Sequence, residues 1–299
     1  MTYSIVARDP DSGALGVAVQ TCWFAVGSLC PWAMAGVGAV ATQAVVEVAY
    51  GPRCLGRLEA GADAATALET ARAADEGSAM RQVGVVDASG TTAAFTGELC
   101  IDHAGHHRGP GYAVQANMMA SPEVWAAMAE AYEAATGPLP GRLHAALRAG
   151  EAAGGDARGA MSAAVLVVEG RRRAHPWEGV MVNVRVDHHR RPLDELARLL
   201  EAADAFDRCD RAEGELFGGD PDVALREVEE ALARLPGNEN ARLLRAGALV
   251  RSGRPEAGMD ELRALVAQRP SWAVVIRSFA DKGLLPLPEG VDLDTIVSP

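Results

Sequence analysis

The chain opens with Thr2-Tyr-Ser-Ile-Val-Ala-Arg8, continues with Asp9-Pro-Asp-Ser-Gly13, and follows with Leu15-Gly-Val-Ala-Val-Gln20. The middle segment combines aspartate, proline, serine and glycine, which is typical of a tight turn. In the third segment, large apolar residues alternate with small ones, which is typical of a strand. The three segments predict a β-hairpin that starts almost at residue 2, so antiparallel strands shape the fold from its first residues.

The same kinds of pattern recur along the chain up to about residue 190. Strand patterns lie near 24–34, 37–43, 82–87, 91–96, 112–117, 162–169 and 180–187, and helical spacing covers 51–60, 63–76, about 121–135 and about 139–152. Hairpins dominate this order, and strictly alternating strands and helices, which a parallel sheet would need, are absent from it. We therefore expect an α+β domain with largely antiparallel sheets and helices on their outer faces.

Composition limits the classes of partner and compartment. The chain carries 28 basic and 40 acidic residues, a net charge of −12, which argues against nucleic acid or an anionic membrane as a partner. Its five cysteines form no CxxC pair and fit a reducing compartment. We see neither a signal-peptide pattern nor an uninterrupted apolar run of spanning length, so we expect a cytoplasmic location.

The tail contains an internal repeat with a period of 34 residues. Gly219, Pro221 and Pro236 recur as Gly253, Pro255 and Pro270. This spacing, with a helix expected between the copies, is that of a tetratricopeptide repeat. The alternative is a set of similar helical pairs without a peptide groove. The sequence thus predicts two domains, residues 1–190 and an all-helical repeat domain at 191–299.

Residue 2 is the first candidate for chemistry. Threonine is small enough for the initiator methionine to be removed, which would leave Thr2 with a hydroxyl and a free α-amine. Such an amine has a pKa of about 7.7–8.0 and can accept the hydroxyl proton near neutral pH. An N-terminal threonine is a known variant of the nucleophile–base pair. Many proteins begin with Met-Thr, so this feature alone establishes nothing.

A series of short motifs runs in order through the first 190 residues. The motifs are Thr2-Tyr-Ser-Ile-Val-Ala-Arg-Asp-Pro10, Gly16-Val-Ala-Val-Gln20, Phe24-Ala-Val-Gly27, Gly36-Val-Gly-Ala-Val-Ala-Thr-Gln43, Tyr50-Gly-Pro52, Gln82-Val-Gly-Val-Val-Asp87, Ala94-Phe-Thr-Gly97, Gly111-Tyr-Ala-Val-Gln115 and Arg185-Val-Asp187. Together they resemble the bacterial "domain of unknown function 1028" family, which is similar to N-terminal-nucleophile hydrolases. The resemblance implies a four-layer αββα sandwich and amide-bond hydrolysis with Thr2 as nucleophile.

The resemblance also draws attention to side-chain amides at strand ends. In the superfamily such amides hold the oxyanion of the tetrahedral intermediate, which needs fixed neutral donors. Asn117 is the preferred candidate, with Gln115, Gln43 and Gln20 as further donors or substrate contacts. Each of these four residues could instead form a structural hydrogen bond.

Three charged or titratable residues complete the expected site. His106 is expected to line the pocket. Arg158 either binds a substrate carboxylate or pairs with Asp156 to hold its loop. Glu47 departs from the neutral segment that the family tends to have, and it either selects a cationic group or faces solvent.

The lysine content bears on the catalytic base. Proteasome-type members of the implied superfamily use a lysine near the threonine. The only lysine here is Lys282, in the helical tail. The α-amine of Thr2 must therefore act as the base, aided by an arginine or by the Ser4 hydroxyl.

Two alternative functions stay open at this stage. One is a metal-dependent hydrolase using His103, His106 and His107, although no HExxH spacing exists. The other is a non-catalytic binding or scaffold protein that acts through the helical tail. We favour a hydrolase of a small-molecule amide that needs no cofactor or metal. We also expect a homo-oligomer, and a tail open to a protein partner.

Overall fold

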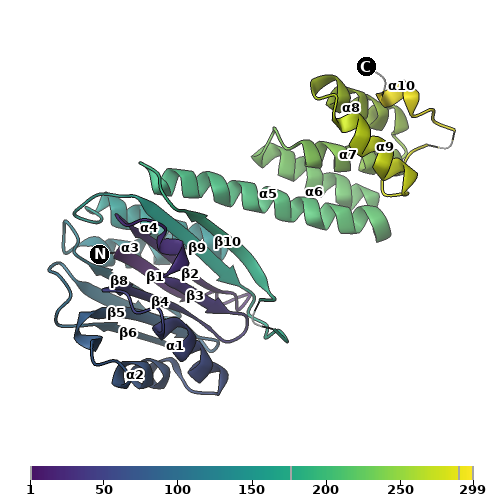
Figure 1. The fold of residues 1–299 in the computed structure, drawn as a ribbon. Helices are drawn as coiled ribbons and strands as arrows, with labels where there is room; N and C mark the ends of the chain where they lie inside the picture. The colour runs from purple at the N-terminus through teal and green to yellow at the C-terminus, as the bar shows by residue number, and fades with distance from the viewer. Residues whose placement is uncertain (1, 176, 289, 298–299) are drawn as a thin grey trace. The chain divides into compact units, whose positions relative to one another are not determined.

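The computed structural model describes residues 2–175, 177–288 and 290–297, which divide into two compact units, Met1–Leu200 and Glu201–Pro299. In the first unit, two β-sheets stack face to face, and a pair of helices covers the outer face of each sheet (Figure 1). This arrangement confirms the predicted α+β class with antiparallel sheets and gives the expected αββα order of layers. Each unit is described by itself below.

The two sheets contain ten strands of the described chain. In spatial order, the six-stranded sheet holds β10 (Val180–Val186), β9 (Ser162–Val168), β2 (Leu15–Thr21), β1 (Thr2–Arg8), β8 (Tyr112–Asn117) and β7 (Gly105–Gly109). The four-stranded sheet holds β3 (Pro31–Met34), β4 (Gly38–Ala44), β5 (Arg81–Asp87) and β6 (Thr92–Thr96). All eight strand pairings are antiparallel, and the predicted opening hairpin forms the centre of the larger sheet.

The two-residue period of β1 sorts its side chains between the layers. Tyr3 and Ile5 pack into the core shared with α3 (Val124–Ala134) and α4 (Leu139–Ala152), whereas Val6 packs into the core between the sheets. The same period places Thr2 and Ser4 on the inner face with Val6. The layer between the sheets is therefore apolar in its middle and becomes polar at the end where β1 begins.

The smaller sheet is covered by α1 (Tyr50–Glu59) and α2 (Ala64–Ala73). Valines of β4 and β5, which face away from the larger sheet, form a third core with these helices. The Asp63 side chain caps α2 by accepting a hydrogen bond of 2.7 Å from the backbone N–H of Thr66. Short 3₁₀ turns occur at Val26–Ser28 and Ser78–Met80.

Several sequence-based boundaries need correction. Only Pro31–Met34 of the predicted strand 24–34 is extended, because Ala25 has a left-handed backbone (φ 54°) and leads into a 3₁₀ turn. Residues 105–109, which lie outside the predicted strands, form the edge strand β7. The first unit also extends ten residues beyond the predicted boundary at 190, because Leu193 and Leu196 are buried in its core.

The second unit consists of stacked helices with the predicted repeat. It contains the larger part of α5 (Pro192–Gly218), followed by α6 (Pro221–Arg234), α7 (Glu239–Arg251), α8 (Pro255–Gln268), α9 (Trp272–Asp281) and the short α10 (Asp294–Val297). The repeated prolines Pro221 and Pro255 each open a helix, where a missing N–H costs nothing.

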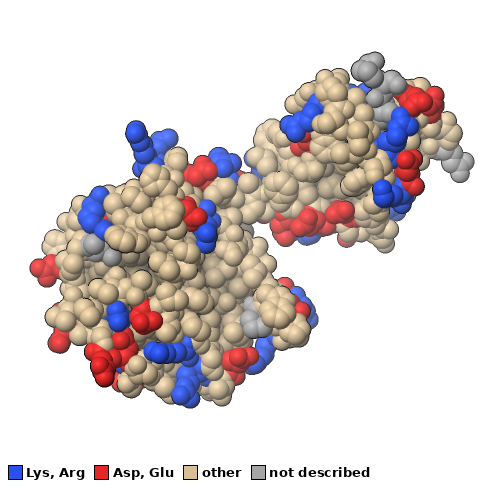
Figure 2. Space-filling model, viewed as in Figure 1, with Lys and Arg blue, Asp and Glu red and all other residues tan. Residues whose placement is uncertain are grey.

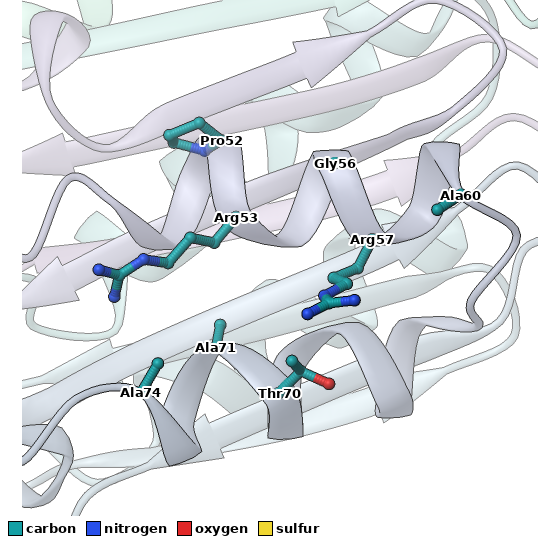
Figure 3. A pocket seen from close by; sticks show the side chains of 8 residues that line it. All are labelled: Pro52, Arg53, Gly56, Arg57, Ala60, Thr70, Ala71 and Ala74. Atoms are coloured by element: carbon teal, nitrogen blue, oxygen red, sulfur yellow. The ribbon is translucent and has the colours of Figure 1, made fainter.

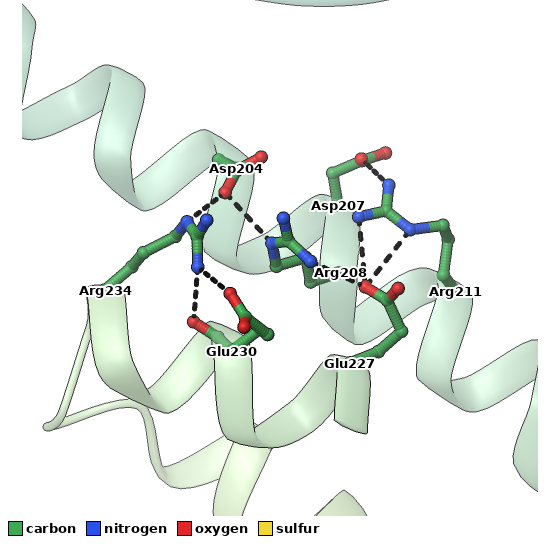
Figure 4. A network of polar contacts seen from close by, with 7 residues as sticks. All are labelled: Asp204, Asp207, Arg208, Arg211, Glu227, Glu230 and Arg234. Atoms are coloured by element: carbon green, nitrogen blue, oxygen red, sulfur yellow. Dashed lines mark hydrogen bonds and ion pairs between the residues drawn. The ribbon is translucent and has the colours of Figure 1, made fainter. Parts of the chain in front are cut away.

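Ion pairs support the apolar contacts between α5 and α6 (Figure 4). Arg208 and Arg211 both reach Glu227, at 3.0 and 3.2 Å, and Arg234 returns from α6 to Asp204. These partly exposed pairs add modestly to stability individually, but they form a connected network along the helix pair.

Charged side chains of both signs are interspersed on the face of the molecule drawn in Figure 2, over both units. No helix of the described residues combines the length and apolar character needed to cross a membrane.

Candidate functional site

A cavity of about 330 Å³ lies where β1 begins and where β2 and β4 end. Its buried floor is polar and consists of Thr2, Thr21, Thr42 and Gln43. Thr2 is only 6% exposed, and its Oγ1 donates a hydrogen bond of 3.2 Å to Thr21 Oγ1. The predicted nucleophile therefore has its hydroxyl at the bottom of a ligand-sized cavity.

Two side-chain amides hold the main chain of Thr2 in place. The Thr2 carbonyl oxygen accepts hydrogen bonds from Gln43 Nε2 at 3.0 Å and from Asn117 Nδ2 at 3.3 Å. Gln43 belongs to the four-stranded sheet and Asn117 to the six-stranded sheet. The position of Thr2 is thus fixed from both sheets at once.

Gln82, at the start of β5, organises these two amides. Its Oε1 accepts hydrogen bonds from Gln43 Nε2 at 2.7 Å and from Asn117 Nδ2 at 2.8 Å. Its Nε2 donates to the backbone oxygens of Ala116 at 2.8 Å and Gly105 at 3.1 Å. Gln82 is fully buried and joins the two sheets through hydrogen bonds alone.

The network continues below Thr2 through Ser4. Gln115 Nε2 donates to Ser4 Oγ at 2.6 Å, and Ser4 Oγ donates to Gln43 Oε1 at 2.6 Å. Gln115 lies directly on Gly84 of β5, where a Cβ atom would come within 2.2 Å of Gln115 Oε1. Only glycine leaves room for this amide between the sheets.

Backbone strain is concentrated at the same end of the sandwich. Ala25, Ala44 and Met118 follow or end strands β2, β4 and β8 and have φ values of 54°, 74° and 54°. Left-handed backbone at a non-glycine residue costs about 1–3 kcal/mol and tends to mark functional sites. Ala44 lines the cavity itself.

The first unit matches a known protein family. A model of the family described as "Family of unknown function (DUF1028)" matches residues 2–196. The chain belongs to this family. A crystal structure of a DUF1028 protein, SPO2555 from Silicibacter pomeroyi, is 34% identical, covers 68% of this chain and 85% of its own, and aligns with a TM-score of 0.61.

A tetratricopeptide-repeat model matches residues 218–275, which confirms the predicted repeat in the tail. No functionally curated protein matches the chain. The DUF1028 assignment confirms the resemblance in the first 190 residues and names no reaction.

The structure of this DUF1028 domain separates the predicted amides by role. Asn117, Gln43 and Gln115 converge on Thr2 and Ser4 as described. Both amide protons of Asn117 are directed to Thr2 O and Gln82 Oε1, so the structure shows it holding Thr2 in place. The Ser4 hydroxyl proton goes to Gln43, which leaves it unsuited to assist the base.

The prediction for Gln20 is wrong. Its strand neighbour Val19 lies between the sheets and Ala18 faces the helices, so Gln20 also faces the helices, away from the cavity. It is fully buried, and neither of its side-chain polar atoms has a hydrogen-bond partner among the described residues.

Glu47 is also outside the cavity. Its Oε1 accepts a hydrogen bond of 3.0 Å from the backbone N–H of Ala49, just before α1. Carboxylates are favoured at this position by the unpaired N–H groups of a helix start. The neighbouring valines Val45 and Val46 line the cavity instead.

Arg158 does line the cavity, and it also forms the ion pair that the sequence suggested. Its Nη2 lies 2.9 Å from Asp156 Oδ2, and the Asp156 side chain is completely buried. Asp156 accepts a further hydrogen bond of 3.0 Å from the backbone N–H of Cys22. The carboxylate thus anchors the guanidinium at the cavity wall from behind.

The histidines do not form a metal site. His106 Nδ1 lies 2.9 Å from Thr96 Oγ1, His103 Nδ1 lies 2.9 Å from Met119 O, and the His107 ring contacts Tyr112. Across the described ranges, no group of three metal-ligating side chains comes together. His106 does not line the cavity. The expected role of His106 as a pocket residue is therefore incorrect.

A larger groove of about 410 Å³ lies between α1 and α2 on the outer face of the smaller sheet (Figure 3). It is walled by Arg53 and Arg57 and floored by small residues of the two helices. Among the described residues that line it, Thr70 carries the only hydroxyl, and no carboxylate or histidine accompanies it there. The groove lacks the combination of groups that surrounds Thr2.

Sequence reasoning missed Gln82 and the apolar wall of the cavity. Gln82, Gly84 and Val86 share one face of β5, so the inward position of Gln82 could have been read from the two-residue period. Nothing local indicates that Val26, Leu29 and Cys30 line a cavity, because they follow a turn that was read as strand.

Proposed function

We propose that this protein is a hydrolase of the N-terminal-nucleophile type that cleaves a small-molecule amide, with Thr2 as nucleophile after removal of Met1. The observation that carries the proposal is the position of Thr2. Its hydroxyl lies on the floor of a cavity, and its carbonyl is held by amides from both sheets. Such preorganisation is what covalent catalysis requires of a nucleophile.

The reaction follows from the groups that Thr2 would carry. Its Oγ1 attacks the amide carbon while the neutral α-amine accepts the hydroxyl proton. The C–N bond breaks, the leaving nitrogen takes that proton, and an ester forms on Thr2. Water then adds to the ester with the amine as base, the bond to Oγ1 breaks, and a carboxylic acid leaves. The threonine hydroxyl is restored.

The residues around Thr2 divide the remaining tasks. Gln43, Asn117 and Gln82 act as positioning residues that fix the Thr2 main chain. Arg158 is the charged donor among the described lining residues and lines the same cavity as Thr2. We assign it the stabilisation of the developing oxyanion, since a fixed cation serves this purpose in a buried site.

The test is a chemical label that needs no known substrate. An acylating β-lactone should add to the N-terminal peptide of the wild-type protein, which mass spectrometry should find beginning at Thr2. Thr2→Ser should keep the label and Thr2→Ala should lose it, with unfolding temperatures unchanged. Both variants retain a small second residue, so Met1 removal is matched. A labelled protein that retains Met1, or a label that persists in Thr2→Ala, would sink the proposal.

A second candidate function rests on the tail. The tetratricopeptide-like match at residues 218–275 favours a role in protein binding, since such repeats form extended interaction surfaces. Deletion of residues 219–299 should then abolish capture of a partner and leave labelling of Thr2 intact. Loss of both, or of neither, would argue against a separate binding role.

A further inference from the structure

The walls of the Thr2 cavity are apolar above its polar floor. Val26, Leu29 and Cys30 line the inner part, and Trp23, Val45 and Val46 line the outer part. Burial raises the pKa of the Cys30 thiol to about 12, so this group is a neutral, weakly polar wall. A ligand in this cavity therefore meets hydrocarbon on several sides.

The apolar side chains of the outer wall are exposed to solvent, and a bound apolar ligand would bury them. Val45 is 55% exposed and Trp23 is 62% exposed, although both are large apolar side chains beside a deep cavity. Contiguous exposed apolar surface of this kind marks ligand or partner sites. The valines occupy the positions next to Glu47, whose carboxylate is turned away to α1.

The charge of the lining distinguishes between the two halves of an amide. Among the described residues that line the cavity, Arg158 has the one charged side chain, and its partner Asp156 is buried behind it and is not in the lining. A guanidinium at the wall attracts a carboxylate and repels an alkylammonium ion. The cavity thus suits the acyl half, which leaves as an acid, rather than the amine half.

The size of the cavity limits the length of the acyl chain. A volume of about 330 Å³ is at the lower end of the range for small-molecule sites. It has room for on the order of ten groups of the size of a water molecule or a methylene. About three of these places go to the carbon, oxygen and nitrogen atoms of the scissile amide.

From these features we infer that the substrate is an N-acyl amide whose aliphatic chain, of roughly six to eight carbons, lies between Val26, Leu29 and Val45 with its carbonyl toward Thr2 and Arg158. This inference rests on the proposed function for the identity of the scissile bond. The class of ligand does not rest on the proposed function, because it follows from the residues that line the cavity.

Calorimetric titration of straight-chain carboxylates tests the ligand class without any catalysis. Each buried methylene should strengthen binding roughly fourfold. Affinity should therefore rise steeply from butanoate to octanoate and then level off where the cavity ends. Octylammonium should bind at least tenfold more weakly than octanoate. Val45→Asp should weaken octanoate binding by about tenfold or more. The same substitution at Val274, a more exposed valine in the tail, should not change it.

Equal affinity for acetate and octanoate, or preference for the ammonium ion, would overturn the inference. Hydrolysis of acetyl, hexanoyl and octanoyl p-nitroanilides separates it from the proposed function. Octanoate binding without hydrolysis of any amide would contradict the Thr2 reaction and support the inferred ligand class. Hydrolysis with no chain-length preference, together with no binding of the carboxylates, would contradict the inferred ligand class and support the Thr2 reaction.

Discussion

The hydrogen-bond network around Gln82 can be tested by stability alone. We consider Gln82→Leu, which keeps the approximate size of the side chain and removes its polar atoms. The substitution leaves one proton of Asn117 Nδ2 without an acceptor in buried surroundings, whereas Gln43 Nε2 keeps Thr2 O and Gln115 O as acceptors. An orphaned buried donor costs about 1–3 kcal/mol, so the network should lose about 1–3 kcal/mol.

Gln20→Leu provides the matched control. Gln20 is also a fully buried strand glutamine of the same domain, but its side chain has no hydrogen-bond partner among the described residues. The gain from burying a leucine is common to both variants and cancels in their difference. Gln20→Leu should therefore be neutral or stabilising, and Gln82→Leu should be less stable than it by about 1–3 kcal/mol.

Urea unfolding followed by tryptophan fluorescence can measure this difference. Trp32 and Trp125 pack against cores of the first unit, and a Trp272→Phe background removes the single tryptophan of the second unit. The free energies of unfolding follow from linear extrapolation at equal m-values. Two variants that agree within about 0.5 kcal/mol would refute the assignment of an energetic role to the Gln82 hydrogen bonds.

Two further predictions concern packing and pH. Gly84→Ala should destabilise the first unit by about 1–3 kcal/mol, because the new Cβ would lie 2.2 Å from Gln115 Oε1. Thermal unfolding measures this loss against Gly141→Ala, whose new Cβ would meet no atom within 4 Å. Burial lowers the pKa of His144 below its ordinary 6.5, so the unfolded chain binds more protons between these two values and stability should fall as pH drops below about 6.5. His144→Gln should reduce that loss; an unchanged profile of unfolding free energy against pH would contradict it.

The sequence predicts the layers of this fold better than it predicts the site. Hairpin turns and two-residue alternation mark the strands of the two sheets, because each strand has one helix-facing and one inner face. The edge strand β7 was missed because His106, His107 and Arg108 are exposed and carry no apolar alternation. Edge strands are often polar in this way, and their pairing is visible only in the structure.

The site shows the same limit at the level of single residues. Thr2 could be singled out because the chemistry proposed for it depends on its place in the sequence, and the structure places it in the lining of the cavity. The contacts among Gln43, Gln82 and Asn117 depend on which strand of one sheet lies opposite which strand of the other. No local pattern contains that information, and so Gln20, on the wrong face of β2, looked as suitable as Gln43.

The polar end of the layer between the sheets also explains how two sheets with small apolar side chains adopt one position relative to each other. Valines and alanines fill the middle of the interlayer, and such side chains pack acceptably in several neighbouring arrangements. The amides of Gln43, Gln82 and Asn117 form their hydrogen bonds in one arrangement only, since a shift of either sheet would leave them unpaired and buried. The apolar middle therefore supplies most of the stability, and the amides select the arrangement that sets Thr2 on the floor of its cavity.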